Sequence, residues 1–561
     1  MKGLSTLDIA VFLLYFVIVS GYGYWIYLRK KKTNTDTKDF FLAEGSLTWW
    51  AIGASLIASN ISAEQFIGMS GDGFFVGTAI AAYEWIAALA LVIISVWFMP
   101  IYLKNKIFTM PQFLTTRYNE TVALIMAIFW LFLYVFVNLT SILYLGAVAI
   151  NGLAGGQSLH LIMILLAVFA LIITLGGMKV IGYTDVIQVA VLIIGGLATT
   201  YMALMIVSEK FGLGRDVFAG FNTLLKEAPD HFHMILDKPG PGASQEEINK
   251  YLILPGIAMY FAGQWIVNLN YWGCNQYITQ RALGADLQTA RMGILFAALL
   301  KLMMPVIVML PGIAAYVLYK NGHLPQLAGG SKDGAYSAIL SFLPAGLKGL
   351  SIAALTAAIV ASLAGKANSI STIFTLDIYK KYLRKDADEK KLVWTGRLAI
   401  LVAMILGVLF TWNDTLGIGG EGGFTFIQKY TGFISPGVFA MFILGMFWKR
   451  TTGRAALVGV ISGFVLSVFF NNYAPSILGH ETLLYTAYPN GKGGYEIPFL
   501  INMGWSFFFT MLLMIVISLS GPKVNEKAFV FEKGMFSMSN KVIALITIIL
   551  MILAALYIRF W

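Results

Sequence analysis

Apolar stretches long enough to cross a lipid bilayer recur along the whole 561-residue chain. A transmembrane helix needs about 20 predominantly apolar residues. We count fourteen such stretches, at residues 7–27, 48–75, 78–103, 121–150, 159–177, 182–208, 252–273, 292–319, 347–379, 394–412, 424–447, 454–471, 498–519 and 541–560. Only 12% of the residues are charged, about half the usual share in soluble domains. The sequence therefore predicts an all-α membrane protein and excludes a water-soluble one.

The distribution of lysine and arginine predicts the orientation in the membrane. Cytoplasmic loops carry an excess of these residues. If the loop that follows Arg29 and Lys30 is cytoplasmic, most of the 39 lysines and arginines lie on that side. We therefore expect a multi-pass protein of the cell (inner) membrane with both termini outside. The net charge of +11 suits anionic lipid head groups, so the lipid bilayer is the expected partner; nucleic acid is not, and no obligatory protein partner is evident.

Polar residues interrupt two of the apolar stretches. The stretch 48–75 contains Ser59-Asn60-Ile61-Ser62-Ala63-Glu64-Gln65, and 252–273 contains Asn268-Leu269-Asn270. Non-helical backbone at membrane depth survives only where it lines a cavity or is buried in protein. The long glycine-containing stretches 48–75 and 347–379 are candidates for a bend or a break.

The two interrupted stretches lie five apart in the series, which is typical of an inverted repeat with a binding site near the bilayer midplane. We expect a single transmembrane transporter domain, 1–561, with this order: an anchoring helix at 7–27, a first repeat at 48–208, a second repeat at 252–447 and three additional helices at 454–560.

Ionisable residues inside apolar stretches cost roughly 2.5–3.5 kcal/mol each on insertion scales, so each is a functional hypothesis. Glu84 and Lys301 are the best placed, with a purely structural ion pair as the alternative. A hexose needs carboxamides and opposite charges around its hydroxyls and one aromatic ring against its apolar face. Six residues supply these groups, and we expect them to line one cavity: Gln65, Glu84, Asn268, Lys301 and Gln428 at the rim, with Tyr271 as the platform.

Long specific stretches resemble the solute:sodium symporter family, and the closest likeness is to the bacterial sodium/galactose (sodium/glucose) cotransporters. The resemblance covers essentially the full length. It is carried by residues 50–71 (WAIGASLIASNISAEQFIGMSG), 83–85 (YEW), 136–146 (FVNLTSILYLG), 184–188 (TDVIQ), 271–273 (YWG), 275–277 (NQY), 310–313 (LPGI), 430–432 (YTG) and 435–437 (SPG).

The resemblance implies a LeuT-like fold: a five-plus-five inverted repeat within 14 transmembrane helices. It also implies that the sugar contacts Gln65, Glu84, Asn268, Lys301 and Gln428, with Asn60 nearby and Tyr271 stacking as the inner gate. Met69, Tyr83 and Phe424 would close the site from outside. A sugar-contacting serine of the family is replaced by Ala87, which could shift the preference among hexose epimers.

The resemblance further implies a sodium site, with sodium as the coupling ion. Its oxygen ligands would come from Ala58, Ile61, Ala358, Ala361 and Ser362. Ala361 stands where the family has a serine, so one hydroxyl is missing.

Lys366 departs from the neutral residues that the family usually places here. It lies four residues after Ser362 and so shares a helical face with that proposed ligand. A buried ammonium needs a partner, and we expect Asp185 to be that partner in a tethered cation pair. The alternative is that Lys366 extends to the cytoplasmic interface.

We therefore expect a sodium-coupled symporter that carries a monosaccharide, of galactose or glucose type, by alternating access. Alternatives within the family are a transporter of inositol, sialic acid, proline or a vitamin, and a weakly sodium-dependent sugar transporter. A sugar sensor that does not transport is an alternative from another class. A membrane enzyme is the weakest, because the sequence has one cysteine and no metal-binding spacing, nucleophile elbow or phosphate loop.

Overall fold

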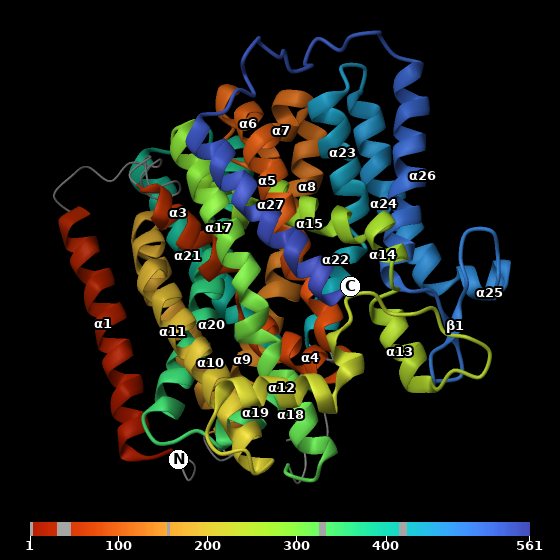
Figure 1. The fold of residues 1–561 in the computed structure, drawn as a ribbon. Coiled ribbons are helices and arrows are strands. Elements are labelled where there is room, and N and C mark those ends of the chain that lie inside the picture. Colours follow the sequence, from red (N-terminus) through yellow and green to blue (C-terminus); the bar gives the residue numbers. More distant parts are fainter. Residues whose placement is uncertain (1–3, 31–46, 154–157, 325–331, 414–422) are drawn as a thin grey trace. The chain divides into compact units, whose positions relative to one another are not determined.

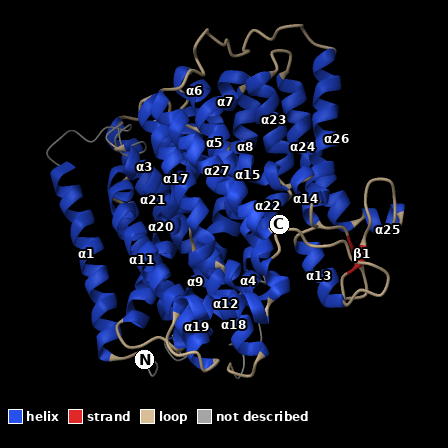
Figure 2. Ribbon diagram, viewed as in Figure 1, coloured by secondary structure: helices blue, strands red, loops and turns tan. Residues whose placement is uncertain are grey.

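Helices make up nearly all of the regular secondary structure of the computed structural model (Figures 1 and 2), which describes residues 4–30, 47–153, 158–324, 332–413 and 423–561. Among these residues, the strands are limited to the short antiparallel pair β1 (Tyr488–Pro489) and β2 (Tyr495–Glu496). The predicted all-α class is confirmed. The chain divides into two compact units, residues 1–81, 127–232 and 280–427 in the first and residues 82–126, 233–279 and 428–561 in the second.

The first unit contains most of the long helices. They and the short helical turns between them are α1 (Thr6–Lys30), α3 (Trp49–Asn60), η2 (Glu64–Met69), α4 (Ser70–Val76), η3 (Gly77–Ala81), η5 (Tyr134–Leu139), α9 (Thr140–Leu153), α10 (Leu159–Thr174), α11 (Met178–Lys210), α12 (Val217–Glu227), η6 (Pro229–Phe232), α17 (Leu287–Val308), α18 (Leu310–Lys320), η8 (Lys332–Gly334), α19 (Ala335–Ser341), α20 (Leu347–Thr372), η9 (Ile373–Leu383) and α21 (Glu389–Thr411). Helix α11 packs along α20 and α3, and α1 lies against α11 and α20 (Figure 1).

The second unit is smaller. Its elements besides β1 and β2 are α5 (Ala82–Ile93), η4 (Ile94–Phe98), α6 (Met99–Lys104), α7 (Met110–Arg117), α13 (Gln245–Ile253), α14 (Ala258–Phe261), α15 (Gln264–Gly273), α23 (Ser435–Phe447), α24 (Gly453–Asn472), α25 (Ala474–Leu478), α26 (Phe499–Leu519) and α27 (Asn540–Phe560). Helices α24 and α26 lie side by side (Figure 1). Three helices contribute residues to both units: α8 (Glu120–Leu133), α16 (Gln276–Leu283) and α22 (Gly423–Gly432).

Ten helices among the described residues are long and apolar enough to cross a membrane, and the pair 245–261 and 264–273, bent by 81°, would make eleven. This confirms a multi-pass membrane protein. The shorter apolar helices α10 and α23 fall in two further predicted stretches. The count of fourteen remains a prediction.

The stretch 48–75 is broken, as expected. Helix α3 ends at Asn60, where Ile61 leaves the helical region with φ −77° and ψ 108°, and the π-helical turn η2 begins at Glu64. The stretch 347–379 behaves differently, because it remains helical from Leu347 to Leu383 and only changes to a π-helix at Ile373. Both stretches contain glycine, so composition alone did not distinguish the broken one.

Small residues bring the helices around this break close together. A Cβ on Gly53 of α3 would lie 2.7 Å from the carbonyl oxygen of Gly293 in α17, and a Cβ on Gly293 would lie 2.8 Å from the Trp49 carbonyl oxygen. Backbones that approach this closely pack well without a side chain between them. Close packing against α17 therefore fixes the position of α3, the helix that leads into the break.

Candidate functional site

The end of α3 at the break is suited to a cation. The last carbonyl oxygens of a helix have no partner within the helix, and they carry the negative end of its dipole. Ala58 and Ile61 lie at this end. Helix α20, which carries Ala358, Ala361 and Ser362, packs against α3.

A hydrogen bond joins the two elements that carry the predicted sodium ligands. The Ser362 hydroxyl donates to the Ser59 carbonyl oxygen at 3.0 Å, and all five predicted ligands belong to the first unit. The oxygens there are backbone carbonyls and one hydroxyl, which fit a sodium ion held at an unwound helix end. Ala361 offers no hydroxyl.

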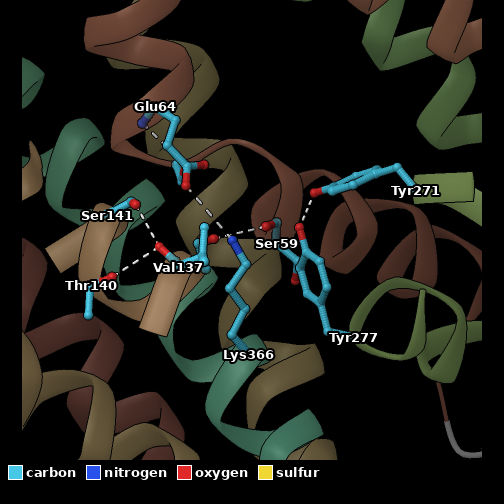
Figure 3. A network of polar contacts seen from close by, with 10 residues as sticks. Ser59, Glu64, Val137, Thr140, Ser141, Tyr271, Tyr277 and Lys366 are labelled. Carbon is cyan, nitrogen blue, oxygen red and sulfur yellow. Dashed lines mark hydrogen bonds and ion pairs between the residues drawn. The ribbon is translucent and has the colours of Figure 1, made fainter. Parts of the chain in front are cut away.

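Lys366 forms its ion pair with a different residue from the predicted one. Its Nζ lies 4.0 Å from Oε1 of Glu64, and Figure 3 shows the ammonium pointing toward that carboxylate. The Ser62 hydroxyl donates to the other carboxylate oxygen of Glu64. Lys366 is only 3% exposed, so the alternative in which it extends to the membrane interface is wrong as well.

Asp185 belongs to a neighbouring network instead. It accepts a hydrogen bond from the Ser55 hydroxyl at 2.5 Å, and the Arg281 guanidinium donates to the same hydroxyl at 2.9 Å. A Cβ on Gly365 would lie 2.4 Å from the Arg281 guanidinium, so the arginine passes close to α20 at a residue without a side chain. The pairing of Lys366 with Asp185 is therefore corrected: Arg281 supplies the cation near Asp185, and Glu64 supplies the anion near Lys366.

The predicted sugar residues are divided between the two units. In the first unit, Gln65 lies on η2 and Lys301 on α17, and these two elements pack against each other. Asn60 is the last residue of α3. All three side chains are buried, with Lys301 only 1% exposed.

The second unit contains the other group. Glu84 lies on α5, and Asn268 and Tyr271 lie on α15, which packs against α5. The Tyr271 hydroxyl contacts the hydroxyl of Tyr277, so the ring is held at its polar end. Gln428, on α22, is half-buried.

Of the three predicted outer gate residues, Met69 and Phe424 belong to the first unit and Tyr83 to the second, and all are buried. A Cβ on Gly68 would lie 2.6 Å from the Cβ of Phe424. The α22 backbone therefore approaches the broken segment directly beside Met69.

A family profile decides the identity of the chain. The profile described as the sodium:solute symporter family matches residues 40–463, which include the break, α20 and every predicted site residue. The chain belongs to this family. Membership confirms the predicted transporter, in place of an enzyme, and confirms sodium as the coupling ion.

Named relatives agree with the symporter assignment. The chain is 43% identical to a protein named sodium/glucose cotransporter from Vibrio parahaemolyticus, over 100% of this chain and 99% of that one. It is 34% identical to sodium/myo-inositol cotransporter 2 from Homo sapiens, over 83% of this chain and 70% of that one. A solved structure described as a substrate-bound, outward-open Na⁺-coupled sialic acid symporter has a TM-score of 0.77 and 20% identity, covering 93% of this symporter and 99% of that chain. The last likeness shows a shared fold.

Sequence reasoning missed two charged residues of this symporter. Glu64 stands within the polar run of 48–75, but its direction depends on the backbone path through the break. Arg281 lies in a short amphipathic segment, typical of a helix in a loop outside the membrane. Its contact with Ser55 depends on the tertiary structure. The sequence did contain one usable signal. A buried charge needs a partner of opposite charge, so each lysine or arginine in or beside an apolar stretch could have been matched with a carboxylate residue.

Proposed function

We propose that this symporter carries a monosaccharide of the galactose or glucose type together with sodium, by alternating access. The observation that carries the proposal is the 43% identity, along the whole chain, to a relative named sodium/glucose cotransporter. The acidic and basic residues of the predicted sugar site also favour a polyol over an organic acid, since a carboxylate substrate would be repelled by Glu84.

The proposed sugar contacts are Gln65, Glu84, Asn268, Lys301, Gln428 and Asn60 for the hydroxyls and Tyr271 for the apolar face. Packing within each unit supports this assignment. Helix α17 brings Lys301 to the element that carries Gln65, and α5 brings Glu84 to the helix of Asn268 and Tyr271. Met69, Tyr83 and Phe424, with Tyr271, are the proposed gates.

Sodium is proposed to bind the carbonyl and hydroxyl oxygens of Ala58, Ile61, Ala358, Ala361 and Ser362. The Ser362–Ser59 hydrogen bond supports this placement, because it holds α20 against the end of α3. Sodium binding from outside would stabilise this contact. Each charge that moves inward across a 100 mV potential contributes about 2.3 kcal/mol to accumulation.

The proposed membrane arrangement is a LeuT-like five-plus-five inverted repeat within 14 transmembrane helices. Its parts are the anchoring helix at 7–27, repeats at 48–208 and 252–447, and three additional helices at 454–560, in the cell membrane with both termini outside. The break in 48–75 and the 81° bend near residue 262, five stretches apart, support the repeat.

A second candidate substrate is myo-inositol, because the human relative of that name is 34% identical. Radiolabelled uptake into proteoliposomes distinguishes the candidates. We expect galactose or glucose to accumulate when a sodium gradient is imposed and myo-inositol to compete weakly. Accumulation of inositol but not of hexose would replace the proposed substrate, and sodium-dependent binding without accumulation would indicate a sensor.

Gln428→Ala should weaken hexose binding by more than about 1 kcal/mol, because the sugar hydroxyls that Gln428 is proposed to bond would be buried without a partner. The half-maximal hexose concentration for uptake measures the effect. Asn472→Ala, in the second unit, is a matched control, because Asn472 is the exposed last residue of α24. Equal affinities in Gln428→Ala and the parent would remove Gln428 from the site.

A further inference from the structure

Lys366 and Glu64 form a buried ion pair at the break in α3. Their side chains are 4% and 9% exposed, and the distance from Nζ to Oε1 is 4.0 Å. Glu64 is the first residue of η2, directly after the break, and the Ser62 hydroxyl at the break bonds its second carboxylate oxygen. The pair therefore joins α20 to the outgoing half of the broken segment (Figure 3).

The pair lies beside the proposed sodium ligands. Lys366 follows Ser362 by one helical turn on α20, so the two side chains project from the same helical face. Ser362 in turn bonds the Ser59 carbonyl oxygen at the end of α3. A fixed ammonium at this position raises the electrostatic potential that a sodium ion would experience, whereas the Glu64 carboxylate lowers it.

We propose that Lys366 and Glu64 together set the sodium affinity of this symporter, with Lys366 acting as a tethered cation that reduces the need for sodium at the break and Glu64 offsetting it. The inference rests on the proposed sodium site. In the folded protein the ammonium already neutralises part of the negative potential of the α3 carboxyl end. Sodium therefore binds this chain more weakly than it would bind the same oxygens without Lys366.

Three variants test the pair as a cycle. Lys366→Met removes the competing charge and leaves Glu64 to attract sodium, so the half-maximal sodium concentration should fall about tenfold. Glu64→Gln leaves Lys366 uncompensated, so that concentration should rise. The double variant should return close to the parent, because both charges are gone. Lys366→Gln serves as a second neutral variant, and Lys366→Arg should retain the parent's sodium dependence.

Sodium binding is measured on the purified full-length protein without sugar. The readout is the rise in melting temperature as sodium chloride replaces potassium chloride at constant ionic strength. Lys332→Met is the matched control. It removes a lysine that pairs with buried Asp72 at 2.5 Å in the same unit but belongs to η8.

The outcomes separate this inference from the proposed function. Stronger sodium stabilisation in Lys366→Met and Lys366→Gln, but not in Lys332→Met, supports the pair. Sodium responses that stay within twofold of the parent in both neutral variants overturn it, and so does an absence of any sodium response in the parent and in both variants. If sodium stabilises the protein in a Lys366-dependent way but no hexose is taken up, the result contradicts only the proposed hexose substrate.

Discussion

Arg281→Met is expected to destabilise the protein by about 3–5 kcal/mol, the usual cost of removing one partner of a buried charged network. Arg281 is 2% exposed and donates to the Ser55 hydroxyl, which donates to Asp185, itself fully buried. Without the guanidinium, the buried Asp185 carboxylate keeps its hydrogen bond from the Ser55 hydroxyl but loses the nearby positive charge. The network also joins α3, α11 and α16, so its loss should loosen all three helices.

Thermal unfolding in detergent measures this effect. The double variant Arg281→Met with Asp185→Asn should recover much of the lost melting temperature, because no charge is then left buried alone. Arg450→Met is the control, since Arg450 bonds the Leu519 carbonyl oxygen at an exposed site. If Arg281→Met and Arg450→Met have the same melting temperature, the buried network contributes nothing to stability.

Tyr271→Ala is expected to weaken hexose binding by roughly 2 kcal/mol or more, about thirtyfold, because it removes the ring that we propose stacks on the sugar. Tyr271→Phe retains the ring and should keep most of the affinity. The structure suggests a further variant, because the Tyr271 hydroxyl contacts the Tyr277 hydroxyl. Tyr277→Phe removes that partner while leaving the Tyr271 ring complete.

Equilibrium binding of radiolabelled hexose to the purified protein is the measurement. The expected order of affinity is parent, then both phenylalanine variants within a few fold, then Tyr271→Ala. Equal losses in Tyr271→Phe and Tyr271→Ala would assign the role to the hydroxyl. Tyr277→Phe would then show the same loss if the hydroxyl pair acts as the gate.

The all-α, multi-pass character of the protein was predictable from the sequence. Apolar length decides which segments can lie in a bilayer, because unpaired backbone groups are too costly there. The polar run before Gln65 likewise located the break, which the structure places at Ile61. Its position follows from local chemistry: serines and an asparagine offer the backbone alternative hydrogen bonds.

The paired charges were decided by tertiary structure. The spacing from Ser362 to Lys366 predicted one shared helical face, and that follows from helix geometry alone. It could not predict which carboxylate faces Lys366, because Glu64 and Asp185 both lie far from it in the chain and both are buried. Arg281 passes close to Gly365 and donates to Ser55, which bonds Asp185. Lys366 pairs with Glu64. Local sequence determines the face on which a charge projects, whereas its partner depends on how distant helices pack, since a buried charge pairs with whichever opposite charge the fold brings within reach.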